Sequence, residues 1–461
     1  MSQVVVCVDF GSTFTKAVAV DLEHGRLLAG AAHRTTIDSD VMDGFDAVRA
    51  ELERALPGAD LDEVRACSSA GGGLRLAVVG YERVVTAEAG ARVGLSAGAR
   101  VVHVSSGAMA DGDVRLLAQS APDVVLLVGG TDGGNADVLL ANAKALSRAR
   151  LPVPVVVAGN VDVSEEVARI LRRGQGAVHV TSNVLPRIGV LDPRPAREAI
   201  RDVFIRHVIG GKHLSRRADL STFVRAATPD TVLAGVELLA DGWQDAAGTV
   251  AGCGDVVLVD VGGATTDVYS VVTPDDETQA HREVVETMWR SRTVEGDLGV
   301  RWNALGIVEA AAGERLLDAE EAERLLDFAR RRVADPGLLP ESAAEAEADV
   351  RLATLAVTTA LRRHARATEE GGVRQPGKDL RRVRLVVGSG GVFRHGSARA
   401  VQTMLTPAVT DRAGGWRLPE APRTTVDTDY VLAAAGLLAD DHPLAAARLL
   451  ETSLLQRLAP G

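Results

Sequence analysis

Residues 256–269 read VVLVDVGGATTDVY, and residues 4–16 read VVVCVDFGSTFTK. Each stretch is an apolar, β-branched run that ends in an aspartate, a glycine-containing turn and hydroxyl side chains. Such runs predict buried strands, and the polar residues after them predict a tight turn into a second strand. Two of these units, roughly 250 residues apart, favour two homologous halves that hold one polyphosphate between them.

The turns have the composition of a phosphate-binding site. Gly11 permits close backbone approach, and the amides and hydroxyls of Ser12 and Thr13 can surround phosphate oxygens. Lys16 can either reach a phosphate or lie on the surface, and a single turn of this kind is also typical of an ordinary hairpin. The second turn repeats the arrangement with Gly262, Gly263, Ala264 and Thr265.

Two aspartates and a third glycine-rich segment complete the candidate site. Asp9 and Asp260 each lie at the end of an apolar run, where a carboxylate can face a hydrated Mg²⁺ ion. A later strand, 383–387, leads into a segment that can pack against a purine and ribose, although alone it is typical of any loop after a strand. That segment is Gly388, Ser389, Gly390 and Gly391.

The overall composition excludes several classes of protein. The chain has 461 residues, a formal net charge of −11, 46% hydrophobic and 25% charged residues, which predicts a folded protein rather than a disordered one. An acidic balance without a basic, aromatic-rich stretch argues against a nucleic-acid-binding protein. Three widely spaced cysteines, no basic N-terminal segment and no apolar window long enough for a membrane span predict a cytoplasmic location.

Strand and helix patterns divide the chain further. Residues 4–8, 17–20 and 26–31 predict a three-strand meander, followed by a helix over 43–56. Between 101 and 182, strand-like runs alternate with helices, which predicts a parallel, doubly wound unit. Its runs are 101–104, 124–128, 153–157 and 177–181, with helices at 136–149 and 165–173. The later expected helices are 302–332, 341–366 and 443–458.

The order and spacing of the three glycine-rich motifs resemble the actin-like ATPase superfamily, which includes Hsp70, actin and the sugar kinases. The resemblance implies an α/β fold of two actin-like (ribonuclease H-like) ATPase halves that close on Mg·ATP. It implies an adenosine role for Gly388, Gly390 and Gly391. It implies phosphate and metal roles for Asp9, Gly11, Ser12, Thr13, Asp260, Gly262, Gly263 and Thr265.

A more specific resemblance covers nearly the whole chain. The stretches DFGSTFTKAVAVD, CSSAGGGLRLAVVG, VVLLVGGTDGGN, VVVAGN, VDVGGATTDVYSV, RTVEGDLGVRWNA and VVGSGGVFRHG resemble the glutamate mutase accessory proteins (the MutL/GlmL type, distinct from the DNA-repair MutL). This resemblance implies an ATP-dependent reactivating factor whose partners are subunits of a coenzyme-B12-dependent mutase. The B12 itself would belong to the partner, because the pattern Asp-x-His-x-x-Gly of a base-off B12 site does not occur in the chain.

These patterns together predict a domain organisation with one large insertion. The predicted limits are 1–75 for the first half, 76–215 for a doubly wound α/β insertion, 216–250 for the return to the first half, 251–440 for the second half with helices in 302–370, and 441–461 for a C-terminal helix.

Two further segments have both a functional and a structural interpretation. Glu295 and Asp297 follow the second turn, where they can orient the attacking water or contact ribose, or simply belong to a capped helix start. Segment 129–135 lies where parallel strands should end, together with 105–107, 159–160 and 182–183. There it suits a small-molecule or cobalamin-domain docking surface, or only tight crossover turns.

Two alternatives stay open at this point, and two others are set aside. A small-molecule kinase of the same superfamily would need a catalytic base, and no acid outside the turns clearly provides one. A nucleotide-dependent filament protein would assemble with ATP. The iron–sulfur activators of 2-hydroxyacyl-CoA dehydratases need paired thiolates, which Cys253 alone does not supply. A Walker A-like spacing at 372–379 is set aside because it ends in aspartate and precedes a strand.

Overall fold

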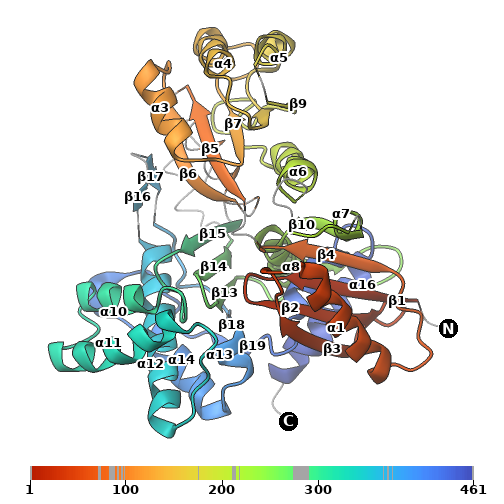
Figure 1. The fold of residues 1–461 in the computed structure, drawn as a ribbon, viewed down its shortest axis with the longest axis vertical. Helices are drawn as coiled ribbons and strands as arrows, with labels where there is room; N and C mark the ends of the chain where they lie inside the picture. The colour runs from red at the N-terminus through yellow and green to blue at the C-terminus, as the bar shows by residue number, and fades with distance from the viewer. Residues whose placement is uncertain are drawn as a thin grey trace.

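Two five-stranded sheets form the body of the protein, and a third sheet lies above them in Figure 1. The computed structural model describes residues 3–70, 74–81, 89–90, 93–94, 97, 99–174, 176–209, 214–217, 219–273, 290–366, 368–370, 373–375 and 377–458. Parts of the quoted stretch CSSAGGGLRLAVVG (71–73) and of the segment 372–379 lie outside the described residues.

The first sheet begins with the predicted N-terminal meander. β1 (Val4–Phe10), β2 (Phe14–Asp21) and β3 (Arg26–Arg34) pair antiparallel in chain order. β4 (Val64–Ser68) pairs parallel with β1, and β10 (Val224–Ala227) pairs parallel with β4. β1 is buried along its whole length, as an unbroken valine-rich run predicts for a central strand.

The second sheet repeats the first strand for strand. β13 (Val256–Val261), β14 (Thr266–Val271) and β15 (Arg290–Glu295) form the antiparallel part. β18 (Leu385–Ser389) and β19 (Arg423–Val426) extend it in parallel. The order β15-β14-β13-β18-β19 thus matches β3-β2-β1-β4-β10. This match confirms the prediction of an α/β fold with two actin-like ATPase halves.

Helices from the middle and from the C-terminal part of the chain pack between these two sheets. α8 (Thr228–Asp241) and α15 (Val431–Leu438) contact each other, and α16 (Pro443–Leu450) packs against α15. Their apolar side chains share one core with Val5 of β1 and Val256 of β13. After α16, a π-helical turn (Glu451–Leu455) and a 3₁₀ turn (Gln456–Leu458) continue the predicted C-terminal helix in a less regular form.

The prediction of one helix over 302–332 is wrong. The structure has two helices there, α10 (Ala304–Gly313) and α11 (Ala319–Ala334). Arg315 adopts a left-handed conformation with φ +58°, which ends α10, and the Asp318 carboxylate caps α11 by accepting from the Glu321 amide. α12 (Ala343–Ala365) confirms the other helix predicted in this region.

The third sheet is fully parallel and is inserted between β4 and β10. It consists of β5 (Arg75–Gly80), β6 (Arg100–Ser106), β7 (Val124–Leu127), β8 (Val155–Val157) and β9 (Val178–Val180) in the order β6-β5-β7-β8-β9. This is the predicted doubly wound insertion, although the strand runs expected from 101 onward omit its interior strand β5. The predicted insertion limits, 76–215, stay a prediction.

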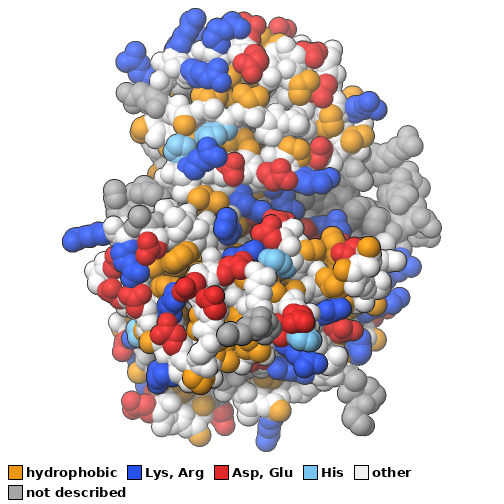
Figure 2. All heavy atoms as spheres, turned by 90° about the vertical axis from the view of Figure 1, so that its right-hand side faces the viewer, with side chains coloured by type: hydrophobic (Ala, Val, Ile, Leu, Met, Phe, Trp, Pro, Cys, Tyr) orange, Lys and Arg blue, Asp and Glu red, His pale blue; other side chains and the backbone are white. Residues whose placement is uncertain are grey.

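The remaining α-helices and two-stranded ribbons connect the sheets or cover them. They are α1 (Val41–Ala55), α3 (Asp111–Gln119), α4 (Asp137–Ala149), α5 (Ser164–Leu171), α6 (Arg194–Val203), α7 (Asp219–Phe223), α13 (Gly391–Arg394), α14 (Ala398–Thr410), and the ribbons β11 (Gly242–Gln244) with β12 (Thr249–Ala251) and β16 (Thr368–Glu370) with β17 (Val373–Gln375). None of the helices in the described ranges is long and apolar enough to cross a membrane. On the face shown in Figure 2, basic and acidic side chains are interspersed over the insertion and the halves.

Candidate functional site

The two strand-end turns have the same geometry. In the first turn, residues 11–14, the Gly11 amide donates to the Phe14 carbonyl at 3.1 Å. In the second turn, residues 262–265, the Gly262 amide donates to the Thr265 carbonyl at 2.9 Å. A Cβ on Gly11 would lie 2.6 Å from the Phe14 oxygen, and one on Gly262 would lie 2.9 Å from the Thr265 oxygen. Only glycine therefore fits at the start of either turn.

The two turns meet although they come from different halves. A Cβ built on Gly263 would lie 3.3 Å from the hydroxyl oxygen of Thr13. The Lys16 ammonium lies 3.6 Å from the Asp9 carboxylate. Burial raises the pKa of Asp260, and the positive charge of Lys16 opposes that rise. Lys16 is therefore within electrostatic range of both strand-end carboxylates.

Hydrogen bonds orient the second turn. The Gly262 and Gly263 carbonyls accept from backbone amides of segment 300–302, and the Ala264 carbonyl accepts from the Asn303 side chain at 2.7 Å. Because segment 300–303 binds the carbonyls of the turn, the backbone amides of the turn are left to bind another partner. The amides that follow Gly262 in this turn donate to no acceptor in the described part of the chain. Successive amides of this kind form a concave site for an anion.

The first turn is held in a similar way by Thr35. The Thr35 hydroxyl donates to the Gly11 carbonyl at 2.7 Å, and its amide donates to the Thr13 carbonyl at 2.9 Å. The buried hydroxyl of Thr13 itself has no hydrogen-bond partner among the described residues. A buried polar group without a partner costs about 1–3 kcal/mol, so a ligand oxygen at this point would be favourable. The residues present thus fit a phosphate group.

Asp9 and Asp260 present carboxylates next to these turns. One oxygen of Asp9 accepts from the Thr228 hydroxyl at 2.6 Å and lies 3.7 Å from the Cys67 sulfur, while the other faces Lys16. Asp260 is half-buried and pairs in register with Ser389 of β18. Within the described ranges no three acidic, histidine or cysteine side chains gather into a metal cage. Two carboxylates completed by water and phosphate oxygens suit Mg²⁺, which dehydrates reluctantly.

The third glycine-rich segment contains glycines of two kinds. A Cβ on Gly388 would lie 3.0 Å from the Phe393 ring, and one on Gly390, at φ +107°, would lie 2.2 Å from the Val261 carbonyl. Packing alone explains both. A Cβ on Gly391 would meet nothing within 4 Å. Gly391 therefore has the open space that the predicted adenosine contact needs.

Glu295 and Asp297 both bind Arg363 of α12. The Arg363 guanidinium donates to Glu295 at 2.8 Å and to the two oxygens of Asp297 at 2.8 and 2.9 Å. α10 begins only at Ala304, so neither carboxylate caps it. Their predicted contact with water or ribose stays a prediction, and in this structure they attach the end of β15 to α12.

Sequence reasoning missed one acid next to the second turn. Asp267 lies opposite Asp260 in the β13–β14 pairing, as Lys16 lies opposite Asp9 in β1–β2. It accepts from the Thr265 hydroxyl at 2.9 Å and forms a buried ion pair with Arg292 at 2.6 Å. Alignment of the two quoted stretches would have found it, because both positions follow their aspartate by seven residues.

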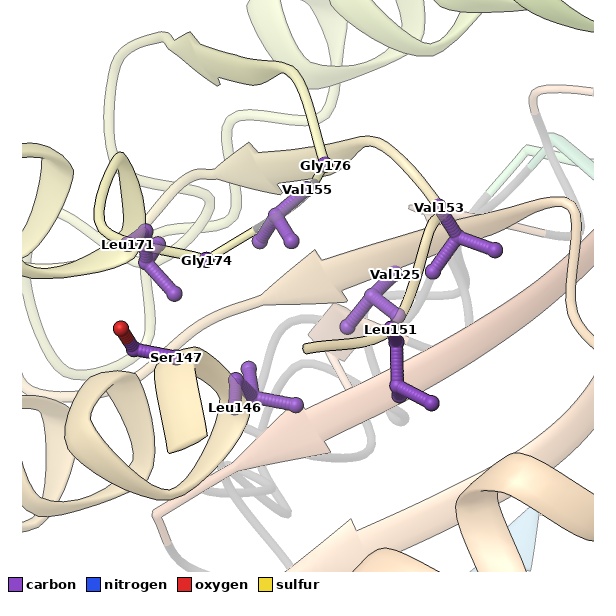
Figure 3. A pocket seen from close by; sticks show the side chains of 9 residues that line it. All are labelled: Val125, Leu146, Ser147, Leu151, Val153, Val155, Leu171, Gly174 and Gly176. Atoms are coloured by element: carbon purple, nitrogen blue, oxygen red, sulfur yellow. The ribbon is translucent and has the colours of Figure 1, made fainter. Parts of the chain in front are cut away.

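The loops at the carboxyl ends of the insertion strands are tied to one another. The Asn160 side chain donates to the Gly134 carbonyl at 3.0 Å, and the Asn183 side chain donates to Gly130 and Asp132 at 2.9 and 2.8 Å. A hollow of about 20 Å³ in this domain lies at the opposite, amino ends of β7 and β8 and has a mostly aliphatic lining (Figure 3). The ligand or docking role expected for segment 129–135 stays a prediction.

Comparison with known proteins supports the family suggested by the sequence. The MutL protein family matches residues 5–454. The chain belongs to the MutL protein family. The protein MutL of Clostridium tetanomorphum is 37% identical over 461 residues, which cover 97% of this chain and 98% of that protein. The resemblance drawn from the motifs is confirmed.

Solved structures similar to this MutL-family chain are more distant. Nucleotide-free acetone carboxylase matches with a TM-score of 0.41 and 14% identity over 95% of this chain and 70% of that one. A glycerol dehydratase reactivase matches with a TM-score of 0.33 and 12% identity over 95% and 99%. The activator of 2-hydroxyisocaproyl-CoA dehydratase from Clostridium difficile with bound ADPNP has a TM-score of 0.31 and 11% identity over 100% and 99%.

Proposed function

We propose that this MutL-family protein is an ATP-dependent reactivating or chaperone-like factor for a coenzyme-B12-dependent mutase of the glutamate mutase or aminomutase type. The approach of Thr13 to Gly263 carries the nucleotide part of the proposal, because it brings two similar turns from separate halves to one point. The mutase part rests on the motif resemblance. We further propose that the protein is a slow Mg²⁺-dependent ATPase.

The chain's own groups would bind the nucleotide from both halves. The free amides of the second turn, with the hydroxyls of Ser12 and Thr13, would donate to the β- and γ-phosphates. The Thr265 hydroxyl would join them once it leaves the Asp267 carboxylate. Asp9 and Asp260 would hold hydrated Mg²⁺, which when bound neutralises phosphate charge and orients the terminal phosphate. Lys16 and the two turns lie close enough together that loss of the terminal phosphate would remove contacts from both halves at once.

The two strands that flank the insertion in the sequence, β4 and β10, both end close to Asp9. On the way out, the amides of Ser69 and Ala70 each donate to the Phe10 carbonyl at 3.0 Å. On the way back, β10 leads directly into Thr228, whose hydroxyl binds Asp9. A shift of the first turn on nucleotide binding would therefore act on both ends of the insertion. Such a movement would loosen a bound mutase subunit and let damaged cobalamin leave.

A nucleotide can drive such a change only through its differential affinity for the two states. Conversion from mostly open to mostly closed requires about 5 kcal/mol. Contacts to one polyphosphate from two turns and a lysine, with two carboxylates acting through Mg²⁺, are of the right order, since each charge-assisted hydrogen bond contributes about 1.5–3 kcal/mol.

The test combines binding, turnover and reactivation. A glutamate mutase inactivated with hydroxocobalamin is incubated with this protein, fresh coenzyme, and either MgATP or no nucleotide, and mutase turnover is measured. We expect recovery only with the protein and MgATP, co-purification of the two proteins, and ATP hydrolysis stimulated by the mutase. Absence of both binding and recovery would contradict the proposal. Phosphate transfer to an added metabolite would favour the kinase alternative, and ATP-dependent sedimentation of the protein alone would favour a filament.

A further inference from the structure

Tyr430 of the second half contacts Lys16 of the first half, next to the strand-end carboxylates Asp9 and Asp260. Its ring centroid lies 4.0 Å from the ammonium nitrogen of Lys16. Lys16 belongs to β2 of the first half, whereas Tyr430 follows β19 of the second half. A cation over an aromatic face is attracted by the ring quadrupole, most strongly where both are shielded from water. The ammonium is therefore held by Asp9 from its own half and by an aromatic ring from the other half.

The backbone of Tyr430 has an uncommon conformation. Its φ and ψ are +56° and +35°, a left-handed region that bulky residues rarely adopt. Such a conformation persists only where the surroundings fix it, and it is concentrated at functional sites. The buried Asp427 carboxylate accepts from the amides of Val431 and Leu432 at 2.9 and 3.1 Å, and Asp429 pairs with Arg457 at 2.6 Å. Residues before and after Tyr430 are thus anchored.

A second cation reaches the same ring from the third glycine-rich segment. The Arg394 guanidinium lies 4.8 Å from the Tyr430 centroid, and Arg394 ends α13, which begins at Gly391. A hollow of about 100 Å³ lies beside the ring. It is lined by Tyr430, Arg394 and Asp429 on one side and by residues of β2 and β3 on the other. The ring therefore lies at a boundary between the halves where there is room for a shift.

We propose that Tyr430 is a positioning residue that holds the Lys16 ammonium between the strand-end carboxylates and directs it at the terminal phosphates. The inference rests on the proposed nucleotide site. Without a fixed ammonium, Asp9 and Asp260 would repel each other and the polyphosphate. Because ring and ammonium come from different halves, their contact also depends on how far the halves are closed.

A double-mutant cycle tests the proposal through nucleotide affinity rather than turnover. The variants are Tyr430→Leu, Lys16→Met and the double variant, and the readout is the Kd for mant-ATPγS with Mg²⁺. We expect Tyr430→Leu to weaken binding about tenfold, as for a shielded cation–π contact. Tyr430→Phe keeps the ring face and should bind like the wild type. In the Lys16→Met background, Tyr430→Leu should weaken nucleotide binding less than about twofold, because the ammonium that the ring contacts is absent.

The possible outcomes separate the inference from the proposed function. If the wild type binds no mant-ATPγS, the proposed nucleotide site itself is wrong. If the wild type binds but Tyr430→Leu weakens nucleotide binding by the same factor with and without Lys16, Tyr430 acts independently of Lys16 and the inference is overturned. A variant that unfolds is replaced by Tyr430→Asn, since asparagine tolerates a left-handed conformation without supplying an aromatic face. Unchanged affinity in that variant would equally overturn the inference.

Discussion

The hydroxyl of Thr228 donates a 2.6 Å hydrogen bond to the Asp9 carboxylate across 219 residues of sequence. The bond joins the end of β1 to the first residue of α8, at the point where the chain returns from the insertion. α8 then packs against α15 between the two sheets. Asp9 is thus attached to the helices between the sheets as well as to Lys16 of β2.

Thr228→Val should separate nucleotide binding from movement of the insertion. Valine keeps the branched shape but cannot donate to Asp9. We expect mant-ATPγS affinity to change by less than about fivefold, because Asp9 keeps its contact with Lys16. ATP-dependent changes in amide exchange over 100–180 should disappear. Thr222→Val is the matched control, since Thr222 is exposed and bonds only within α7. An unchanged exchange response in Thr228→Val would show that the coupling runs elsewhere.

Asp260→Asn should lower activity without lowering stability. Burial raises the pKa of Asp260, so ionisation of this carboxyl lowers the stability of the folded state relative to the unfolded state. Removal of that charge should leave the free energy of unfolding in urea equal or higher. ATP hydrolysis should fall at least about a hundredfold if the carboxylate holds the metal. Unchanged ATP hydrolysis would mean that Asp260 does not hold the metal. A large loss of stability would mean that the ionised carboxylate stabilises the fold despite its burial.

Gly390 and Gly391 should respond in opposite ways to alanine. Gly391→Ala adds a methyl group in open space at the start of α13, so stability should stay equal or rise by up to about 1 kcal/mol. If adenosine packs there, its affinity should fall. Gly390→Ala would force a Cβ to 2.2 Å from the Val261 carbonyl at positive φ and should destabilise by several kcal/mol. Thermal unfolding and mant-ADP titration measure the two effects separately. Equal nucleotide affinity in Gly391→Ala would argue against the adenosine assignment.

Much of the candidate site could be predicted because its signals are local. Strand, aspartate, glycine and hydroxyl follow one another in the sequence, and the two turns fold as those patterns predict. The conformation of Arg315, which divides α10 from α11, has no such signal because arginine rarely adopts positive φ. The same holds for Tyr430. Its role depends on a contact with Lys16 from the other half, and no local pattern encodes a contact between distant segments.

The glycine pattern at 388–391 shows how local signals can also mislead. Gly388, Ser389 and Gly390 all have close neighbours in the structure. Packing against the Phe393 ring explains Gly388, and the nearby Val261 carbonyl explains Gly390. Only Gly391 leaves space. A glycine needed for packing and a glycine needed for ligand approach look the same in a sequence, because both lack a side chain and only the neighbouring atoms distinguish them.

Asp427 should make the stability of the protein depend on pH in mildly acidic solution. Burial raises the pKa of this carboxyl to about 6, although the Leu432 and Val431 amides oppose the rise. Between about pH 4 and pH 6 the folded state holds a proton that the unfolded state has lost. The contribution of this protonation to the free energy of unfolding is therefore fully present below about pH 4 and is lost as the pH rises to about 6. Asp427→Asn removes the titration but keeps an acceptor for only one of the two amides, because these amides donate to different oxygens of the carboxylate.

The measurement is the difference in unfolding free energy between Asp427→Asn and the wild type from pH 4 to pH 7. A difference is needed because buried His364, whose pKa burial lowers well below its usual value, makes stability fall as the pH drops below about 6.5. As the pH rises from 4 to 7, we expect the free energy of unfolding of the variant to increase relative to that of the wild type by up to about 3 kcal/mol. Each unit of pKa shift corresponds to about 1.4 kcal/mol. A constant difference would mean that Asp427 is ionised throughout, and that its two amide bonds outweigh the cost of its burial.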